Sequence, residues 1–217
     1  MSHYSISPTE TFHGMDSYDL LVTAVAPRPI AFVSTLSADE KSNLAPFSFF
    51  NAGGANPPSV IFSPCTKADG SEKDTLRNIR ETGEYVINIV SYDMREGMNQ
   101  TSLPLPHGES EWPRSGFTPA PSIVVKPARV AEAPFSLECR MHQIVPHGTG
   151  PDAANYIIGE VVQFHVAKHL VEDGVIHPDR GQQLSRLGGA WFARTSAETL
   201  FTLQRPKMSP SNTDCCS

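Results

Sequence analysis

The sequence lacks three features that would direct it to nucleic acid, membrane or export. It has no basic excess, because 17 Lys and Arg face 23 Asp and Glu and leave a net charge of −6. Nucleic-acid binding needs a basic face, so we expect no nucleic-acid partner. No apolar run approaches the 18 or so residues of a membrane span, and we expect no membrane insertion. The first ten residues have neither a basic start nor an apolar core, which predicts a cytoplasmic protein without a secretory signal.

Common catalytic and metal-binding signatures are also missing. The four cysteines form no framework, since Cys65 and Cys139 are far apart and the other two lie in the last three residues. His165 and His169 are four apart, but the surrounding run resembles a strand, where four residues span roughly 13 Å. We therefore expect no metal site. Neither G-x-S-x-G nor S-x-x-K occurs, so nothing supports a serine hydrolase.

Proline is abundant, with 19 in 217 residues against an average near 5%. Six fall between Pro27 and Pro64 and seven between Pro104 and Pro134, whereas only Pro178 lies between residues 152 and 205. Proline cannot donate a hydrogen bond to a sheet ladder, so dense proline marks strand ends and loops. The composition predicts two loop systems and a more regular stretch after residue 152.

Short β-branched or aromatic runs bounded by turn residues predict several strands: Ile30–Leu36, Val60–Ser63, Glu84–Val90, Phe135–Val145, Tyr156–Val166 and Ala190–Arg194. Helices are expected over Ser17–Val25 and Thr75–Thr82, with a weaker one over Asp93–Thr101. Many short strands with few helices favour a mainly antiparallel barrel with helical excursions. The small, polar end Lys207–Ser217 is expected to be a disordered tail.

The segment Gly148–Ala153 (GTGPDA) matches the G-x-G-x-x-A pattern of dinucleotide sites. That chemistry needs a strand before the glycines and a helix after them. Here a β-rich run follows, and Pro151 lies inside the motif. We interpret the segment as a hairpin loop.

Two other segments admit a functional interpretation. Lys73–Thr75 places an ammonium, a carboxylate and a hydroxyl at the start of a helix, where free amides suit a phosphate. A simple helix cap by Asp74 explains the same residues and is favoured on spacing alone. Asn43–Phe50 (NLAPFSFF) mixes aromatic rings with Asn, Pro and Ser, which suits a planar heterocycle. An edge strand with a proline bulge fits equally well.

Taken together, these segments resemble the flavin reductase-like proteins with an FMN-binding split barrel. The resemblance spans about residues 20–195 and favours the phosphate site over the cap. The matching pieces occur in the family's order: RPIAFVST (28–35), SNLAPFSFF (42–50), PPSVIF (57–62), KDTLRNI (73–79), GEYVINI (83–89), MNQTS (98–102), SLEC (136–139) and LGG (187–189).

The resemblance implies a six-stranded antiparallel Greek-key split barrel over residues 1–206, with a few peripheral helices. It also implies a homodimer with FMN near the subunit interface. Lys73 and Thr75 would hold the phosphate, and His165 lies where related reductases contact the nicotinamide, although its flanking pattern departs from theirs. The other flavin-contacting residues would be Asn43, Ala45, Pro46, Ser48, Phe62, Ser63, Gln100, Thr101, Ser102, Arg186 and Trp191.

The implied function is an FMN-binding oxidoreductase, with an NAD(P)H-dependent flavin reductase as the first hypothesis. A flavoredoxin-like electron carrier and an FMN enzyme acting on an organic substrate remain open. Arg28 and Arg95 are further candidates for tuning the flavin. The loop Pro64–Glu72 is longer than in the smallest members of the family, and Leu103–Pro127 is a long proline-rich insertion. Both are expected to border the cofactor, where they would select the substrate.

Overall fold

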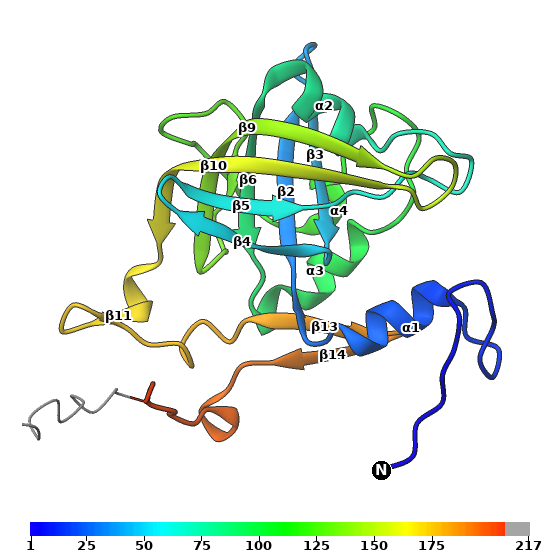
Figure 1. Cartoon of the computed structure of the whole chain (residues 1–217). Helices are drawn as coiled ribbons and strands as arrows, with labels where there is room; N and C mark the ends of the chain where they lie inside the picture. The colour runs from blue at the N-terminus through cyan, green and yellow to red at the C-terminus, as the bar shows by residue number, and fades with distance from the viewer. Residues whose placement is uncertain (207–217) are drawn as a thin grey trace, which may run out of the picture.

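A computed structural model describes residues 1–206 and is dominated by one large antiparallel sheet (Figure 1). Its strands follow the order β3-β2-β6-β9-β10-β5-β4. Their bounds are β2 Ala31–Leu36, β3 Ser42–Phe47, β4 Phe50–Ala55, β5 Pro58–Phe62, β6 Glu84–Ile89, β9 Phe135–His147 and β10 Ala154–Val166. The expected strands are confirmed to within a few residues at their ends. The prediction for residues 207–217 lies outside the described residues.

The chain itself closes this sheet into a barrel. Strands β3 and β4 form opposite edges of the sheet, yet only Ser48 and Phe49 separate them in the sequence. The sheet must therefore curl until the end of β3 lies close to the start of β4, although the two edge strands do not pair with each other. It holds seven hydrogen-bonded strands where six were expected, because Phe50–Ala55 pairs with β5 as an additional edge strand.

The smaller elements lie around the barrel. Strands β1, β13 and β14 make a second sheet beside α1, below the barrel in Figure 1. The remaining bounds are β1 Arg28–Pro29, β7 Pro119–Ala120, β8 Arg129–Val130, β11 Val171–Glu172, β12 Val175–Ile176, β13 Leu184–Gly188, β14 Trp191–Arg194, α1 Ser17–Ala24, α2 Asp74–Thr82, α3 Arg95–Gln100, α4 Trp112–Ser115, and the 3₁₀ helices η1 Tyr92–Met94, η2 Lys168–Leu170 and η3 Ala197–Thr199. No helix within residues 1–206 is long and apolar enough to cross a membrane.

The hairpin interpretation of Gly148–Ala153 is confirmed. Strands β9 and β10 pair antiparallel from Ala154 opposite His147, so the six residues between them form the hairpin loop. Gly148 and Gly150 take positive φ angles of 88° and 82°, which suits glycine in a tight turn. No helix follows the glycines, and the dinucleotide pattern therefore lacks its structural context.

Strand β2 is buried on both faces and separates two apolar layers. Side chains alternate across a strand, so Ala31 and Val33 point into the barrel while Phe32 points outward. The inner layer also holds Leu76 and Ile79 of α2, which places α2 against the barrel interior. The outer layer joins β2 and β3 to α3 through its own apolar set: Ile30, Phe32, Leu44, Val90, Met94, Met98, Val130 and Leu184.

Helix α2 ends as expected but begins differently. Gly83 has a left-handed φ of 71° and donates its amide to Ile79, as a C-terminal cap does. Asp74 lies inside the first turn, and Lys73 occupies the cap position without a side-chain hydrogen bond. The cap alternative for Asp74 was therefore wrong. Its carboxylate accepts hydrogen bonds from His107 and Gly108, in the segment after α3.

Candidate functional site

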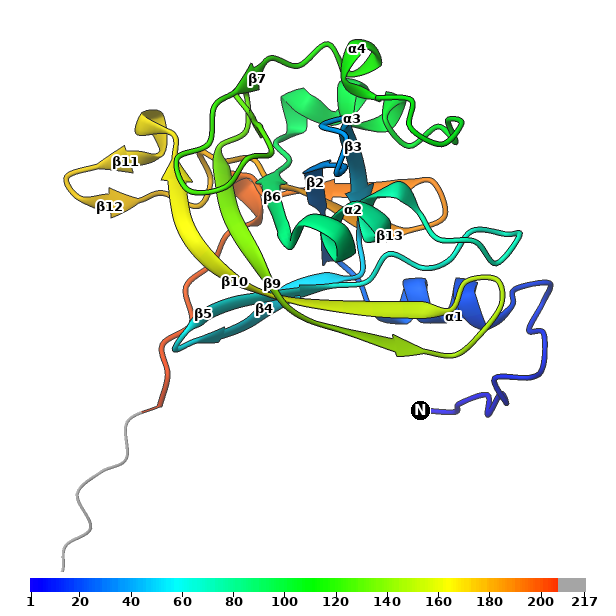
Figure 2. The same ribbon diagram turned by 90° about the horizontal axis from the view of Figure 1, so that it is seen from above.

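A cavity of about 370 Å³ lies between β3, the start of α2 and the segment that follows α3. Figure 2 shows α2, β3 and α3 gathered on one side of the barrel, beside the green segment that joins α3 to α4. The cavity lies within the size range of small-molecule sites. It brings together seven predicted flavin-contacting residues from three separate segments: Asn43, Ala45, Pro46, Lys73, Thr75, Thr101 and Ser102.

The start of α2 gives this cavity an anion-binding end. The amides in the first turn of a helix have no intrahelical partners, and Lys73 at the cap position offers them no side-chain hydrogen bond. Thr75 is 1% exposed, and its hydroxyl accepts a hydrogen bond of 2.9 Å from the Asn43 amide. The ammonium of Lys73 lies 5.5 Å from the centre of the Phe47 ring, and Lys67 lines the same cavity. Two cations, a hydroxyl and a helix N-terminus therefore converge there.

The opposite wall is the open edge of β3. This strand pairs with β2 only. Alternate residues of β3 therefore direct their backbone N–H and C=O groups away from β2, where no further strand pairs with them. The Leu44 amide points outward and donates to the Glu111 carboxylate at 2.9 Å. Pro46, two residues on, faces the same way and has no amide to donate. The outward carbonyls of this edge are the groups left to meet a ligand.

Two carboxylates fasten the proline-rich segment Leu103–Pro127 over the cavity. Asp74 Oδ2 accepts the Gly108 amide at 2.9 Å, and Asp74 Oδ1 lies 2.8 Å from His107 Nδ1. Partial burial raises the pKa of Asp74, but these hydrogen bonds outweigh it and hold the pKa below its ordinary value. For Glu111, burial dominates and raises the pKa, although the Leu44 amide opposes it.

Both long loops border the cavity. The segment Leu103–Pro106 and residues Glu109 and Glu111 line it from the second loop, and Lys67 lines it from the first. Sequence reasoning anticipated this placement for the two loops but named none of these residues. The length of each loop indicated that the loop borders the cavity, but it did not indicate which of its side chains line the cavity.

Other predicted site residues lie elsewhere. Phe62 is 1% exposed and packs between the rings of Phe47 and Tyr85, at centroid distances of 5.5 and 5.6 Å. Ser63 accepts a hydrogen bond from the Asn155 amide and lines a separate hollow between α1 and the start of β10. Ser48 links β3 to β4, and Gln100 is exposed at the end of α3, next to Thr101.

His165, Arg186 and Trp191 are also outside the cavity. His165 Nε2 lies 2.6 Å from the buried carboxylate of Glu138, on the strand pair β9–β10. Arg186 belongs to β13 and lines a different pocket on the other side of α3, together with the tuning candidate Arg95. Trp191 is 75% exposed at the start of β14.

Comparisons with known proteins agree with this architecture. The family model described as the flavin reductase like domain matches residues 24–184. A protein from Halalkalibacterium halodurans, named as uncharacterized, is 43% identical over 196 residues, which cover 89% of this chain and 93% of that protein.

Two solved structures are similar along almost their whole length. Nitrilotriacetate monooxygenase component B from Bacillus cereus is 38% identical with a TM-score of 0.86, and the match covers 94% of this chain and 100% of that one. The 2-nitrobenzoate 2-nitroreductase of Pseudomonas fluorescens is 29% identical with a TM-score of 0.81, over 97% and 100% of the two chains. With most of its length covered by the family model, the chain belongs to the flavin reductase-like family and has the split-barrel fold.

Proposed function

We propose that the protein is an FMN-binding oxidoreductase and that it works as an NAD(P)H-dependent flavin reductase. The observation that carries this proposal is the convergence of seven predicted flavin-contacting residues, from three distant segments, on one cavity. We further propose that the functional unit is a homodimer of the domain formed by residues 1–206. The exposed apolar side chains of Tyr18 and Leu21 on α1, and of Val25 directly after it, support such an assembly because they have no cover in a single chain.

The chemistry of the cavity fits FMN. Lys73, Thr75 and the amides at the start of α2 would hold the phosphate, and Lys67 would add a second positive charge. Asn43 positions the Thr75 hydroxyl through a buried hydrogen bond. The apolar side chains of Ala45 and Leu105 and the ring of Pro46 would cover the flat body of the flavin.

Within this proposal, bound FMN supplies the capacity to accept a hydride, and the chain supplies binding, orientation and electrostatics. The tethers at Asp74 and Glu111 keep the proline-rich segment closed against β3 and restrict the access of water. Lys67 and Lys73, at the α2 end of the cavity, would bind the phosphate and so orient the cofactor. No general base is required for a hydride transfer.

A second candidate is an FMN enzyme that reduces an organic substrate. The structural similarity to a 2-nitrobenzoate 2-nitroreductase favours it, as does a cavity wall made from the long proline-rich segment Leu103–Pro127. A flavoredoxin-like electron carrier is the third candidate. The three candidate functions share FMN as the cofactor. They differ in the electron donor that reduces FMN and in the acceptor that reduced FMN then reduces.

Anaerobic mixing of the FMN-loaded protein with NADH or NADPH tests the proposed reductase. We expect the flavin absorbance near 450 nm, a general property of oxidised flavins, to bleach within seconds with at least one of the two donors. Reduction by dithionite alone would contradict the reductase and favour a carrier. If bleaching occurs, a screen of free FMN and nitroaromatic acids as acceptors separates the reductase from the enzyme with an organic substrate.

The phosphate role of α2 gives a second test. Lys73→Ala should weaken FMN binding at least tenfold and leave riboflavin, which lacks the phosphate, nearly unchanged. Thr75→Ser retains the hydroxyl and should resemble the wild type. Lys168→Ala removes an ammonium from η2, far along the chain from the cavity, and serves as the charge control. Equal losses for FMN and riboflavin in Lys73→Ala would refute the phosphate role.

A further inference from the structure

A second pocket of about 590 Å³ lies where α3 meets the small sheet below the barrel (Figure 1). It shares no lining residue with the proposed flavin cavity. Its walls come from η1, α3, β13 and β14. Its lining residues are Tyr92, Arg95, Glu96, Met98, Asn99, Leu184, Arg186, Ala190, Phe192, Ala193 and Arg194.

Positive charge is concentrated in this pocket, although the whole chain carries a net charge of −6. Arg95, Arg186 and Arg194 all line it, and Glu96 is the only acidic residue among the lining residues. The Glu96 side chain is 80% exposed and lies 3.5 Å from Arg95, a weak pairing in water. Within the described part of the chain, neither Arg186 nor Arg194 forms an ion pair.

Aromatic rings hold these guanidinium groups in place. The Tyr92 ring lies 4.2 Å from the Arg95 guanidinium carbon and 4.6 Å from that of Arg194. Phe192 lies 4.5 Å from that of Arg186. Arg186 Nη2 donates to the Gly189 carbonyl at 2.8 Å, and Arg95 Nη1 donates to the Tyr92 carbonyl at 3.0 Å. Stacking on a ring leaves the remaining N–H groups of each guanidinium available for hydrogen bonds to a carboxylate or a phosphate. The pocket therefore presents oriented anion-binding groups.

The adjacent strand brings a second arginine close to Arg186. Arg28 on β1 is the direct cross-strand partner of Arg186, and like charges in that position destabilise a sheet. Burial lowers the pKa of Arg28 below its ordinary value, and the charge of Arg186 adds to the effect. Arg28 is 5% exposed, and its Nη1 donates to the carbonyls of Val22 and Val25. Within residues 1–206 its Nε has no hydrogen-bond partner. An anion bound at Arg186 would relieve this repulsion.

We propose that this pocket binds a flat organic anion, that is, a phosphate or carboxylate carried by an aromatic ring system. The arginine forks recognise the anionic group, and Met98, Leu184 and Phe192 supply an apolar surface for the ring. Its volume exceeds what an inorganic ion needs and lies within the range of small-molecule sites. The site is distinct from the flavin cavity and goes beyond the proposed function.

Two sources share this chemistry. One is the phosphorylated adenosine half of a dinucleotide, which would identify where a hydride donor is held and in that case rests on the proposed reductase function. The other is an aromatic acid. Adenosine 5′-monophosphate and benzoate represent the two sources, inorganic phosphate represents the anion alone, and adenosine represents the ring without charge.

Calorimetric titrations of the full chain test the proposal, with the flavin cavity loaded with one equivalent of FMN and excess FMN removed, because free FMN would compete for an anion pocket of this kind. We expect adenosine monophosphate or benzoate to bind at least tenfold more tightly than adenosine or inorganic phosphate, and more weakly as salt is raised. Arg194→Gln and Arg186→Gln should each weaken that binding about tenfold. Arg140→Gln, an exposed arginine on β9, is the matched control and should have no effect.

The outcomes separate the sources and the two proposals. Preference for adenosine monophosphate supports the dinucleotide source, and preference for benzoate supports the aromatic acid. Failure of both probes to bind, equal binding of inorganic phosphate, or retention of affinity in Arg194→Gln would overturn the inference. Arg194 is exposed and outside the flavin cavity, so Arg194→Gln should fold and should bind FMN as the wild type does, whatever the anion pocket does.

Discussion

Replacing Glu138 with glutamine is expected to lower the free energy of unfolding by about 3 kcal/mol. The side chain is 0% exposed and accepts four hydrogen bonds. They come from the amides of Ile123, Val124 and Val125, at 2.7, 2.6 and 3.0 Å, and from His165 at 2.6 Å. Because a glutamine amide nitrogen cannot accept, at least one of these donors would face another donor in a buried position.

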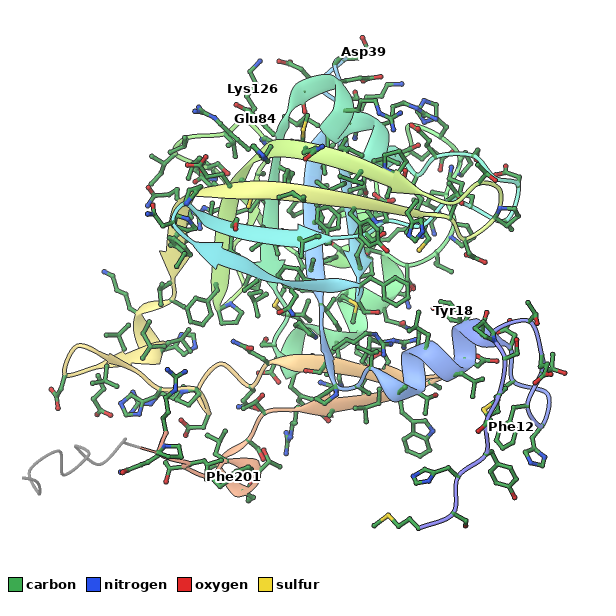
Figure 3. The ribbon with its side chains drawn as sticks, viewed as in Figure 1. Phe12, Tyr18, Asp39, Glu84, Lys126 and Phe201 are labelled. Carbon is green, nitrogen blue, oxygen red and sulfur yellow. The ribbon has the colours of Figure 1, made fainter. Side chains whose placement is uncertain are left out.

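The effect should reach the proline-rich segment that covers the flavin cavity. The next amide, Lys126, donates to Glu84, and Figure 3 shows these two residues close together at one end of the barrel. Four consecutive amides of the segment are thus held by two carboxylates. Thermal unfolding should show a midpoint lowered by about 6–12 °C for a chain of this size.

The pH dependence gives an independent readout. Burial raises the pKa of Glu138, but its hydrogen bonds outweigh burial and hold the pKa below the ordinary value of 4.5. The unfolded state therefore takes up this proton at a higher pH than the folded state does, and stability falls as the pH drops below about 4.5. Glu138→Gln should lose part of this dependence.

The matched control is Glu132→Gln. Glu132 also accepts an amide from the same segment, that of Thr118, but it is exposed to solvent. We expect a loss below about 1 kcal/mol, because water can replace the bond. If Glu138→Gln were as stable as this control, the hydrogen bonds that Glu138 accepts would make no net contribution to stability.

Gly97→Ala should damage both pockets at once. An alanine Cβ at this position of α3 would lie 2.3 Å from the Ser115 carbonyl oxygen and 2.7 Å from the Phe117 ring. Backbone cannot yield as a flexible side chain does, so α3 must shift away from α4. We expect a loss of about 2–3 kcal/mol in stability and at least a tenfold loss in FMN affinity, because Thr101 and Ser102 follow α3 directly.

Equilibrium unfolding and flavin fluorescence titration measure these two effects. Gly181→Ala is the control, since its added Cβ would meet nothing closer than 3.7 Å. Full FMN affinity in a destabilised Gly97→Ala protein would show that the position of α3 does not determine the flavin cavity.

Much of the barrel could be predicted because its strands carry local signals. Runs such as Glu84–Ile89 are β-branched and bounded by turn residues, and Gly83 marks the end of α2. The short strands β1, β7 and β8 have two residues each and no detectable pattern. These strands form because tertiary contacts elsewhere in the chain fix the neighbouring loops and so bring the paired backbones together.

The site was less accessible to sequence reasoning for a physical reason. Lys73 and Thr75 follow a motif, so their place at the head of a helix could be anticipated. Phe62 also belongs to a matching segment, but the alternation of β5 turns it into the barrel core. Glu111 and Arg194 carry no local pattern, because their roles depend on which distant backbone or ring the fold places beside them.

The open edge of β3 has a consequence for how the protein behaves in a crowded solution. An exposed edge strand can recruit the strand of another molecule and begin aggregation. Here Pro46 offers no donor and Glu111 occupies the Leu44 amide, while a bulge between Ala52 and Gly54 distorts the edge of β4. Loss of the Glu111 carboxylate would therefore be expected to promote aggregation as well as to loosen a pocket wall.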